Sequence, residues 1–470
     1  MIKAPSVIPA PFFGVCFGIL FGVLLALLPR EIVAPFGIFI LGLLLGLLLI
    51  SHYEQSEGKR LMALFLSAYG IRTFLSVFFY LVSFFYQDSL HFGFLFINDG
   101  WAYHEDASRM VGMRNFGFDP FMFGVPTAWK TGRETIPVPY EHWNYYIYRY
   151  TGTSPLSMFM LNSFFGSLPV LIIYNFVRNL FGQKTGIRAA TIFAFWPSLI
   201  LWSTQNLKDP IEIGALTLFV SSLLGIARKP TLFHFAFLAG SWVVLLRLQK
   251  FLLLVALASW LMTHFVLLKV HRIPWMRFFW SLVLAMLCLL FVFRVVTKGV
   301  VMKWVTQLQN SFISYLWQEH QKFFAGQFQT LNTLRQGRAT GGSAFLSNID
   351  ISSPGSLLAF GPLLFCFVWF GPFPWQAIGG LFKFFGSAEM LVFYSFMPAF
   401  WRGIQRVLRY KRVTGWFLIS IITIIMLSIA LLDANLGTAF RHRAVILPFV
   451  FVLIAVGWDK KEIQTRDGDG

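Results

Sequence analysis

The sequence predicts an all-α, polytopic transmembrane helical bundle of about 12 or 13 crossings with a long non-cytoplasmic loop region. Apolar residues make up 57% of the chain and charged residues only 12%, against about 25% charged residues in soluble domains. Apolar stretches of about 20 residues, the length that one bilayer crossing requires, recur between short polar connections. The stretches are apolar on every side, which excludes the alternating pattern of a transmembrane β-barrel.

Thirteen apolar segments are candidate crossings, at residues 11–29, 31–50, 61–86, 155–177, 186–204, 210–227, 231–247, 251–268, 278–296, 355–371, 384–401, 415–432 and 443–458. We interpret the first as a transmembrane helix and not as a cleaved signal, because a second apolar segment follows at once. The predicted organisation is two additional N-terminal helices (1–59), a core (60–296) with a first long outer loop (87–153), a second long loop (297–354) and C-terminal helices with a short basic tail (355–470).

Basic residues gather after the fourth, sixth and eighth apolar segments, and they predict the orientation. Basic loops lie on the cytoplasmic side of membrane proteins, so residues 87–153 are predicted to lie outside. Basic cytoplasmic loops then explain the net charge of +18. Membrane lipids, but no nucleic acid, are the expected partners. Strict alternation places the basic loop 402–412 outside, so one later segment is misassigned. Either 372–386 is re-entrant, or 299–325, which has amphipathic spacing, hides a crossing.

The first outer loop carries an acidic candidate site. Asp99 precedes residues 101–114, which have helical character, so its carboxylate would lie near the free N–H groups of a helix start. Asp209 follows Lys208 at the start of a later crossing. Each aspartate is also explained as a helix cap. The alternative is a polar cluster of Asp99, Lys208 and Asp209 at one membrane surface, in which a carboxylate acts as a base.

Cations on the same face form a second candidate site. Arg247 lies between two apolar runs, and Arg441, His442 and Arg443 precede the last apolar run. Arginine binds phosphate through paired hydrogen bonds, so a phosphate-bearing ligand is one interpretation. The alternative is that each arginine anchors a helix end at the membrane interface.

His104, Glu105 and Asp106 follow Asp99 closely in the outer loop. They are a candidate source of metal ligands, although a solvated helix face explains them more simply. The sequence implies no certain cofactor and leaves open whether a divalent metal takes part. It contains no P-loop, no GxGxxG after a strand, no HExxH and no CxxC.

Three motifs together resemble the GT-C integral membrane glycosyltransferases, which include the protein O-mannosyltransferases and the aminoarabinose transferases of lipid A. The first motif is Asp99 with Tyr103, Ala107, Met110 and Gly112. The second lies within Pro155–Asp209 and ends in Leu207-Lys208-Asp209. The third is Phe440-Arg441-His442-Arg443 before Pro448. The resemblance covers about residues 60–458, so two extra crossings precede it, and Gly100 stands where many members carry a second acidic residue.

The resemblance implies an inverting transfer of a sugar from a polyprenyl-phosphate donor to an acceptor hydroxyl on a lipid, a glycan or a protein. It places the reaction at the non-cytoplasmic face of the cell membrane, and the expected membrane is a bacterial inner membrane. Asp99 is then the general base, Asp209 shapes the site, and Glu105 or Asp106 replaces the missing second acid. The expected substrate-binding residues are Tyr103, Lys208, Arg247, Arg441, His442 and Arg443.

Two other functions stay open at this point. A polysaccharide polymerase or ligase, which uses a pyrophosphate-linked glycan, also pairs a long outer loop with cations but depends on arginine and histidine. A lipid or glycan transporter (flippase) predicts paired inverted repeats and broken helices. Dependence of activity on Asp99 distinguishes the glycosyltransferase from both.

Overall fold

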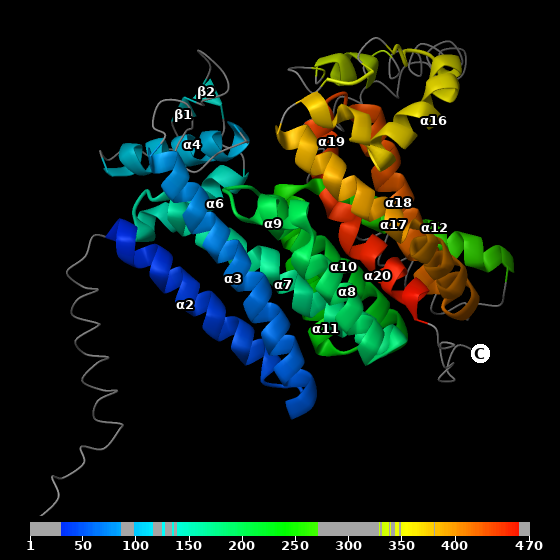
Figure 1. The fold of residues 1–470 in the computed structure, drawn as a ribbon, viewed down its shortest axis with the longest axis horizontal. Coiled ribbons are helices and arrows are strands. Elements are labelled where there is room, and N and C mark those ends of the chain that lie inside the picture. Colours follow the sequence, from blue (N-terminus) through cyan, green and yellow to red (C-terminus); the bar gives the residue numbers. More distant parts are fainter. Residues whose placement is uncertain are drawn as a thin grey trace, which may run out of the picture. The chain divides into compact units, whose positions relative to one another are not determined.

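The computed structural model describes residues 30–85, 98–115, 125–126, 134–135, 139–270, 329, 331–337, 339, 344–346, 349–379 and 381–459. These residues are mostly helical (Figure 1), apart from two short antiparallel strands, β1 (Val125–Pro126) and β2 (Glu134–Thr135). The predicted helical class is therefore confirmed. The chain divides into two compact units, unit 1 (Met1–Leu168 and Ser203–Lys208) and unit 2 (Pro169–Trp202 and Asp209–Gly470).

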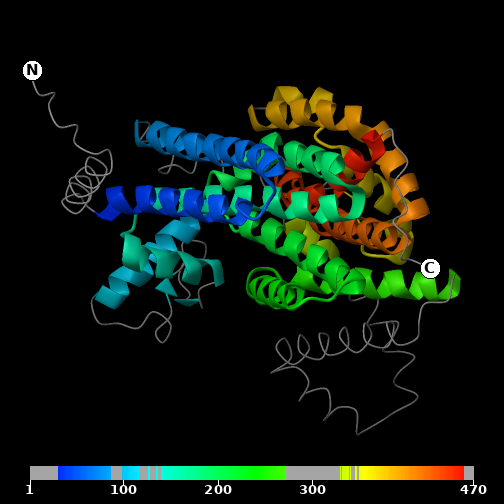
Figure 2. The same cartoon turned by 90° about the horizontal axis from the view of Figure 1, so that it is seen from below.

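The helices of unit 1 are α2 (Arg30–Ile50), α3 (Gln55–Phe85), α4 (Asn98–Asn115), α6 (Pro139–Thr151) and the first part of α7 (Pro155–Phe181). α2 and α3 lie side by side (Figure 2), because glycines in α2 leave room for rings of α3. A Cβ atom on Gly46 would lie 2.1 Å from the Phe65 ring, and one on Gly42 would lie 2.6 Å from the Tyr69 hydroxyl. Such small residues allow membrane helices to approach closely.

α4 and α6 are the polar helices of unit 1, and they pack against each other. Tyr103 and Tyr140 meet edge to face with ring centroids 5.0 Å apart, and His104 Nδ1 lies 2.8 Å from the Tyr148 hydroxyl. Burial lowers the pKa of His104 to about 4 and raises the pKa of Tyr148, because loss of hydration disfavours the charged form of each group. His104 is therefore neutral at pH 7.

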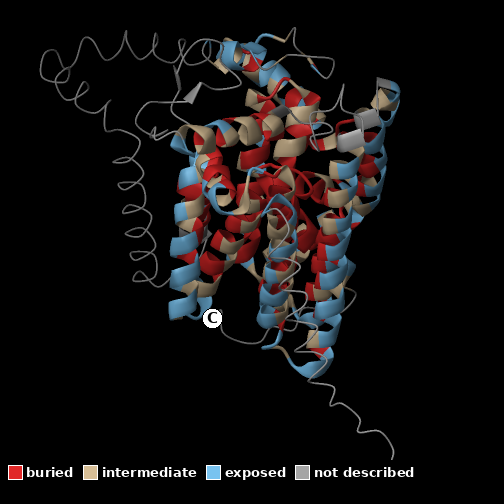
Figure 3. Ribbon diagram, turned by 90° about the vertical axis from the view of Figure 1, so that its left-hand side faces the viewer, coloured by how far each residue is buried: buried red, intermediate tan, exposed pale blue. Residues whose placement is uncertain are grey.

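Unit 2 contains the rest of α7 and the following elements: α8 (Gln183–Phe195), α9 (Pro197–Ser203, to Trp202), α10 (Asp209–Arg228), α11 (Leu232–Leu248), α12 (Lys250–Val270), α16 (Pro354–Phe370), η1 (Pro374–Gly379), α17 (Leu381–Tyr410), α18 (Arg412–Leu432), α19 (Leu436–Arg443), η2 (Ala444–Ile446) and α20 (Leu447–Trp458). α20 is buried at every residue from Leu447 to Gly457 and forms the core of the unit. Buried residues, red in Figure 3, line the inner faces of the helices.

α17 and α20 approach each other through glycines. A Cβ atom on Gly403 of α17 would lie 1.8 Å from the Leu453 carbonyl oxygen, and one on Gly457 of α20 would lie 1.8 Å from the Ala399 carbonyl oxygen. Both obstacles are backbone atoms, which cannot rotate away. The contact between these two helices therefore requires glycine at both positions.

Six stretches within the described residues are long and apolar enough to cross a membrane: α2, α3, α7, α10, α18 and Leu436–Trp458. A seventh is added if α8 and α9, which meet at a 59° bend, form one span. The chain is therefore a multi-pass membrane protein. The predicted apolar segments inside the described residues are helical, but segment 186–204 is divided between α8 and α9. Segments 11–29, 278–296 and 299–325 lie outside those residues, so the total of 12 or 13 crossings stays a prediction.

One end of unit 2 gathers basic residues that lie far apart in the sequence. Arg228 donates a hydrogen bond to the Asn179 carbonyl oxygen at 2.9 Å. Arg188 lies 3.8 Å from the Asp459 carboxylate, and Arg406 donates to the Asp459 carbonyl oxygen. The ends of α7, α10, α17 and α20 and the start of α8 therefore share this basic end.

The basic loops 178–188 and 402–412 therefore lie at the same end of unit 2. Strict alternation of the predicted crossings, which places them on opposite sides, is wrong on this point. α16, with 17 residues, is not one of the six candidate spans, and neither are α11, α12 and α17. Phe345, before α16, stacks on Phe367 near its end with ring centroids 5.9 Å apart, so the chain doubles back here. The number of crossings between the two basic loops therefore stays a prediction.

Gly403→Val is expected to destabilise the protein, because the added side chain overlaps the backbone of α20. Overpacking of this kind costs about 1–3 kcal/mol. The measurement is the Tm of the purified protein in detergent. Gly240→Val in α11 is the matched control, since no atom lies within 4 Å of a Cβ atom there. Equal Tm values for the two variants would contradict the close contact.

The stability of the protein is expected to fall as the pH drops below about 6.5, in part because of His104. The folded pKa of about 4 lies below the ordinary value of 6.5, so the unfolded chain binds the proton first, and His104 contributes a loss of roughly 2 kcal/mol at pH 5. The measurement is Tm at pH 7.5 and pH 5. His104→Gln should reduce the difference, while replacement of the exposed His52 should not. An unchanged pH dependence in His104→Gln would refute this assignment.

Candidate functional site

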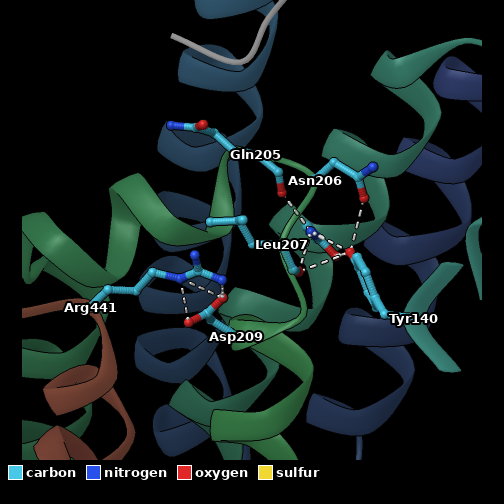
Figure 4. Close-up of polar contacts among 7 residues, drawn as sticks. Tyr140, Gln205, Asn206, Leu207, Asp209 and Arg441 are labelled. Carbon is cyan, nitrogen blue, oxygen red and sulfur yellow. Dashed lines mark hydrogen bonds and ion pairs between the residues drawn. The ribbon is translucent and has the colours of Figure 1, made fainter. Parts of the chain in front are cut away.

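Residues 203–208 connect α9 to α10 and form an irregular, mostly buried polar segment of unit 1. Backbone groups of such a segment have no helical partners and need side chains to satisfy them. Asn162 of α7 donates hydrogen bonds to the carbonyl oxygens of Gln205 and Leu207, the latter at 2.8 Å. The Tyr140 hydroxyl lies 2.9 Å from the Leu207 carbonyl oxygen (Figure 4). These two side chains fix the path of the segment.

Asn206 joins this segment to the start of α4. Its Oδ1 accepts a hydrogen bond from Asn144 at 3.1 Å, and its Nδ2 donates to the Gly100 carbonyl oxygen at 3.3 Å. Gly100 follows Asp99, which is half-buried in the first turn of α4. Two polar motifs that lie far apart in the sequence therefore meet within unit 1.

Gln205 and Asn144 carry buried amide atoms that have no hydrogen-bond partner in the described part of the chain. Gln205 is 0% exposed, and neither its Oε1 nor its Nε2 is paired; Oδ1 of Asn144 is also unpaired. A buried polar group without a partner costs about 1–3 kcal/mol, so such groups mark a bound ligand or water. Figure 4 shows the Gln205 side chain directed away from Tyr140. These amides suit a hydroxyl-rich ligand.

Arg72 of α3 is a fully buried charge that the predicted site did not include. Its Nε donates to the Ser203 hydroxyl at 2.9 Å, and its Nη1 donates to the Ala68 carbonyl oxygen at 3.0 Å. Gly166 makes room, because a Cβ atom there would lie 2.3 Å from Ser203 Cβ. The signal in the sequence is a lone arginine inside an apolar segment, which in membrane proteins marks a functional position.

The remaining predicted residues of α4 face different partners. Glu105 forms an ion pair with Arg109, and Asp106 is buried with its carboxylate 4.0 Å from the same arginine. Tyr103 contacts Tyr140, which belongs to the hydrogen-bond network around Asn206. Of these three predicted residues, only Tyr103 contacts the hydrogen-bond network that reaches the start of α4. Glu105 and Asp106 instead lie beside Arg109.

Asp209 and Arg441 form a two-point ion pair within unit 2 (Figure 4). Arg441 Nε lies 2.9 Å and 3.0 Å from the two carboxylate oxygens, and Nη2 lies 2.7 Å from Oδ2. Asp209 is 2% exposed in the first turn of α10. The planar guanidinium matches a carboxylate through parallel hydrogen bonds, which fixes the orientation of both groups. The predicted second carboxylate thus holds one of the predicted phosphate ligands.

The other two residues of the basic motif bind elsewhere in unit 2. His442 Nδ1 lies 2.6 Å from the Asp433 carboxylate. Arg443 is buried, and its Nη1 donates to the carbonyl oxygens at the end of α16, at 3.2 Å to Val368, 3.0 Å to Trp369 and 2.9 Å to Gly371. Arg443 therefore satisfies the last turn of a helix.

Glu389 of α17 is a second buried charge that the sequence analysis did not select. Its carboxylate accepts hydrogen bonds from Trp196 Nε1 at 2.7 Å, from the Ser198 N–H at 2.7 Å and from the Ser198 hydroxyl at 2.9 Å. These donors lie at the bend between α8 and α9. The carboxylate satisfies polar groups that the broken helix leaves without helical partners.

Lys208 and Arg247 are the remaining predicted residues. Lys208 is half-buried in unit 1, and Arg247 is exposed in the last turn of α11 in unit 2. Arg247 makes no hydrogen bond or ion pair with another described residue. Among the residues that the structure describes, no three histidine, cysteine or acidic side chains lie where they could hold a metal ion.

Asp209→Asn is expected to destabilise the protein by about 3 kcal/mol, because it leaves the largely buried Arg441 guanidinium without its carboxylate. The measurement is Tm or denaturant unfolding of the purified protein. Glu105→Gln is the matched control, since the Glu105 pair with Arg109 is more exposed than the Asp209 pair, and the contribution of an ion pair falls with its exposure. Equal losses in the two variants would show that the Asp209 pair is not important for the fold.

No protein-family model matches the chain, and no curated protein matches it.

Proposed function

We propose that the protein is a membrane glycosyltransferase that moves a sugar from a polyprenyl-phosphate donor to an acceptor hydroxyl. The observation that carries this proposal is the Asn206–Gly100 hydrogen bond, which holds the amide segment at the start of α4, beside Asp99. A carboxylate next to buried amides offers a base together with groups that orient hydroxyls. In unit 2 the Asp209–Arg441 pair joins two further motifs of the GT-C resemblance.

Asp99 is the proposed general base. It accepts the proton of the acceptor hydroxyl while that oxygen bonds to the anomeric carbon of the sugar. The bond between the anomeric carbon and the phosphate oxygen breaks, and polyprenyl phosphate leaves with the electron pair. Attack from the face opposite the phosphate inverts the anomeric centre. Gln205 and Asn144 are the proposed partners for sugar hydroxyls, since their amide atoms are buried and unpaired among the described residues.

Arg441 is the proposed ligand of a substrate phosphate. A departing phosphate gains negative charge, which a cation of fixed orientation stabilises. Asp209 provides the fixed orientation and is therefore a positioning residue. Arg443 is the weaker candidate, because its Nη1 is shared among three carbonyl oxygens.

The orientation of unit 2 supports a non-cytoplasmic location for Asp209. The basic end of the unit contains Arg188, Arg228 and Arg406, and basic ends face the cytoplasm. α10 runs from Asp209 to Arg228 and is long enough to cross the membrane. Asp209 therefore lies at the opposite end, as the proposed reaction requires.

Asp99→Asn is expected to reduce sugar transfer at least about a hundredfold, because it removes the base and keeps the shape of the side chain. The measurement is transfer of label from a panel of radiolabelled polyprenyl-phosphate sugars to cell-envelope acceptors, in membranes that hold equal amounts of each variant. Glu54→Gln is the control, because it removes an exposed carboxylate of the same unit that is not a candidate site residue. Gln205→Leu should raise KM more than it lowers kcat.

Four outcomes would count against the proposal. Full transfer by Asp99→Asn would show that Asp99 is only a first-turn residue of α4. Equal loss in Glu54→Gln would point to a general effect of charge. Failure of wild type with every donor, together with transfer from a pyrophosphate-linked glycan, would favour the polymerase or ligase. Movement of labelled lipid across the bilayer without transfer would favour the transporter.

A further inference from the structure

A hollow of about 450 Å³ lies at the basic end of unit 2, lined by Arg402, Gln405, Arg406 and Arg409 of α17. These positions are spaced by three or four residues, so they share one face of the helix. The lining therefore carries three positive charges within two helical turns. Nothing in the proposed sugar transfer uses these residues.

The arginines of this hollow are not neutralised by the part of the chain that the structure describes. Arg402 and Arg409 are exposed and form no ion pair with a described carboxylate. Arg406 donates only to backbone oxygens, one of them that of Val456 at 3.0 Å. The nearby Asp459 carboxylate binds Thr185 at 2.8 Å and Arg188 at 3.8 Å. Like charges four residues apart on a helix repel each other, so a bound anion would stabilise this face.

Two tryptophans place the hollow at the level of the membrane interface. Trp401 adjoins Arg402 and is 61% exposed, and Trp458 at the end of α20 is 37% exposed. Exposed tryptophan in a membrane protein is typical of the headgroup region. An anion at this depth is more readily supplied by a lipid than by the bulk solution, because anionic headgroups concentrate at the cytoplasmic surface.

We propose that this hollow binds the phosphate of an anionic membrane lipid. Arg402 and Arg409 supply the hydrogen bonds and charge, and Arg406, anchored on the end of α20, fixes the third guanidinium. The inference is independent of the proposed glycosyltransferase activity.

The test is lipid binding to the purified full-length protein by native mass spectrometry. The probes are phosphatidylglycerol and phosphatidylcholine with identical short acyl chains, and inorganic phosphate as competitor. We expect phosphatidylglycerol to bind more tightly than phosphatidylcholine. The double variant Arg402→Gln/Arg409→Gln should weaken phosphatidylglycerol binding by about tenfold or more, since each basic residue near an anionic surface contributes about 1 kcal/mol.

The matched control is Lys229→Gln/Arg412→Gln, which removes the same charge from exposed positions of the same end outside the hollow. It should leave binding within about twofold of wild type. Three results would overturn the proposal: equal binding of the two lipids, equal weakening by the two double variants, or full displacement of the lipid by inorganic phosphate at the same concentration. The last result would identify a site for free phosphate.

Discussion

Backbone groups inside a membrane protein must be satisfied by the protein itself, and in unit 1 this constraint is concentrated at residues 203–208. Tyr140 and Asn162 satisfy the carbonyl oxygens of this irregular segment. The same bonds tie α6 and α7 together around it. Asn206 then extends the network to the Gly100 carbonyl oxygen. The position of Asp99 at the start of α4 therefore depends on how a broken stretch of backbone is hydrogen-bonded.

Arginine performs a related task in unit 2. Arg443 bonds to three carbonyl oxygens at the end of α16, and Arg406 bonds to two at the end of α20. The last carbonyl groups of a helix have no partners within it, and a cation is favoured there by the helix dipole. Basic residues near helix ends thus contribute to packing as well as to topology. Arginines that bond to helix ends in this way are already occupied, so not every basic residue in the sequence can bind a substrate.

The sequence predicts what depends on local patterns. Apolar length predicts the helices, and a helix with Asp99 in its first turn follows from the polar residues after it. What it cannot predict are pairings of residues that lie far apart. Asp209 and Arg441 are each visible as charges at helix ends, but nothing local indicates that they bind each other. Glu389 lies inside an apolar segment, and its role becomes clear only beside the α8–α9 bend.

The basic motif shows why a sequence pattern and a site differ. Arg441 and Arg443 are two residues apart on α19, and residues at that spacing face different sides of a helix. One therefore meets the Asp209 carboxylate and the other meets the carbonyl groups of α16. A phosphate matches a guanidinium as a carboxylate does, because both present paired oxygens, but displacing Asp209 would leave a buried carboxylate without its partner. A phosphate could not replace three backbone carbonyls without leaving the end of α16 unsatisfied. A substrate phosphate is therefore proposed to share Arg441 with Asp209, which stays in place as the residue that orients the guanidinium.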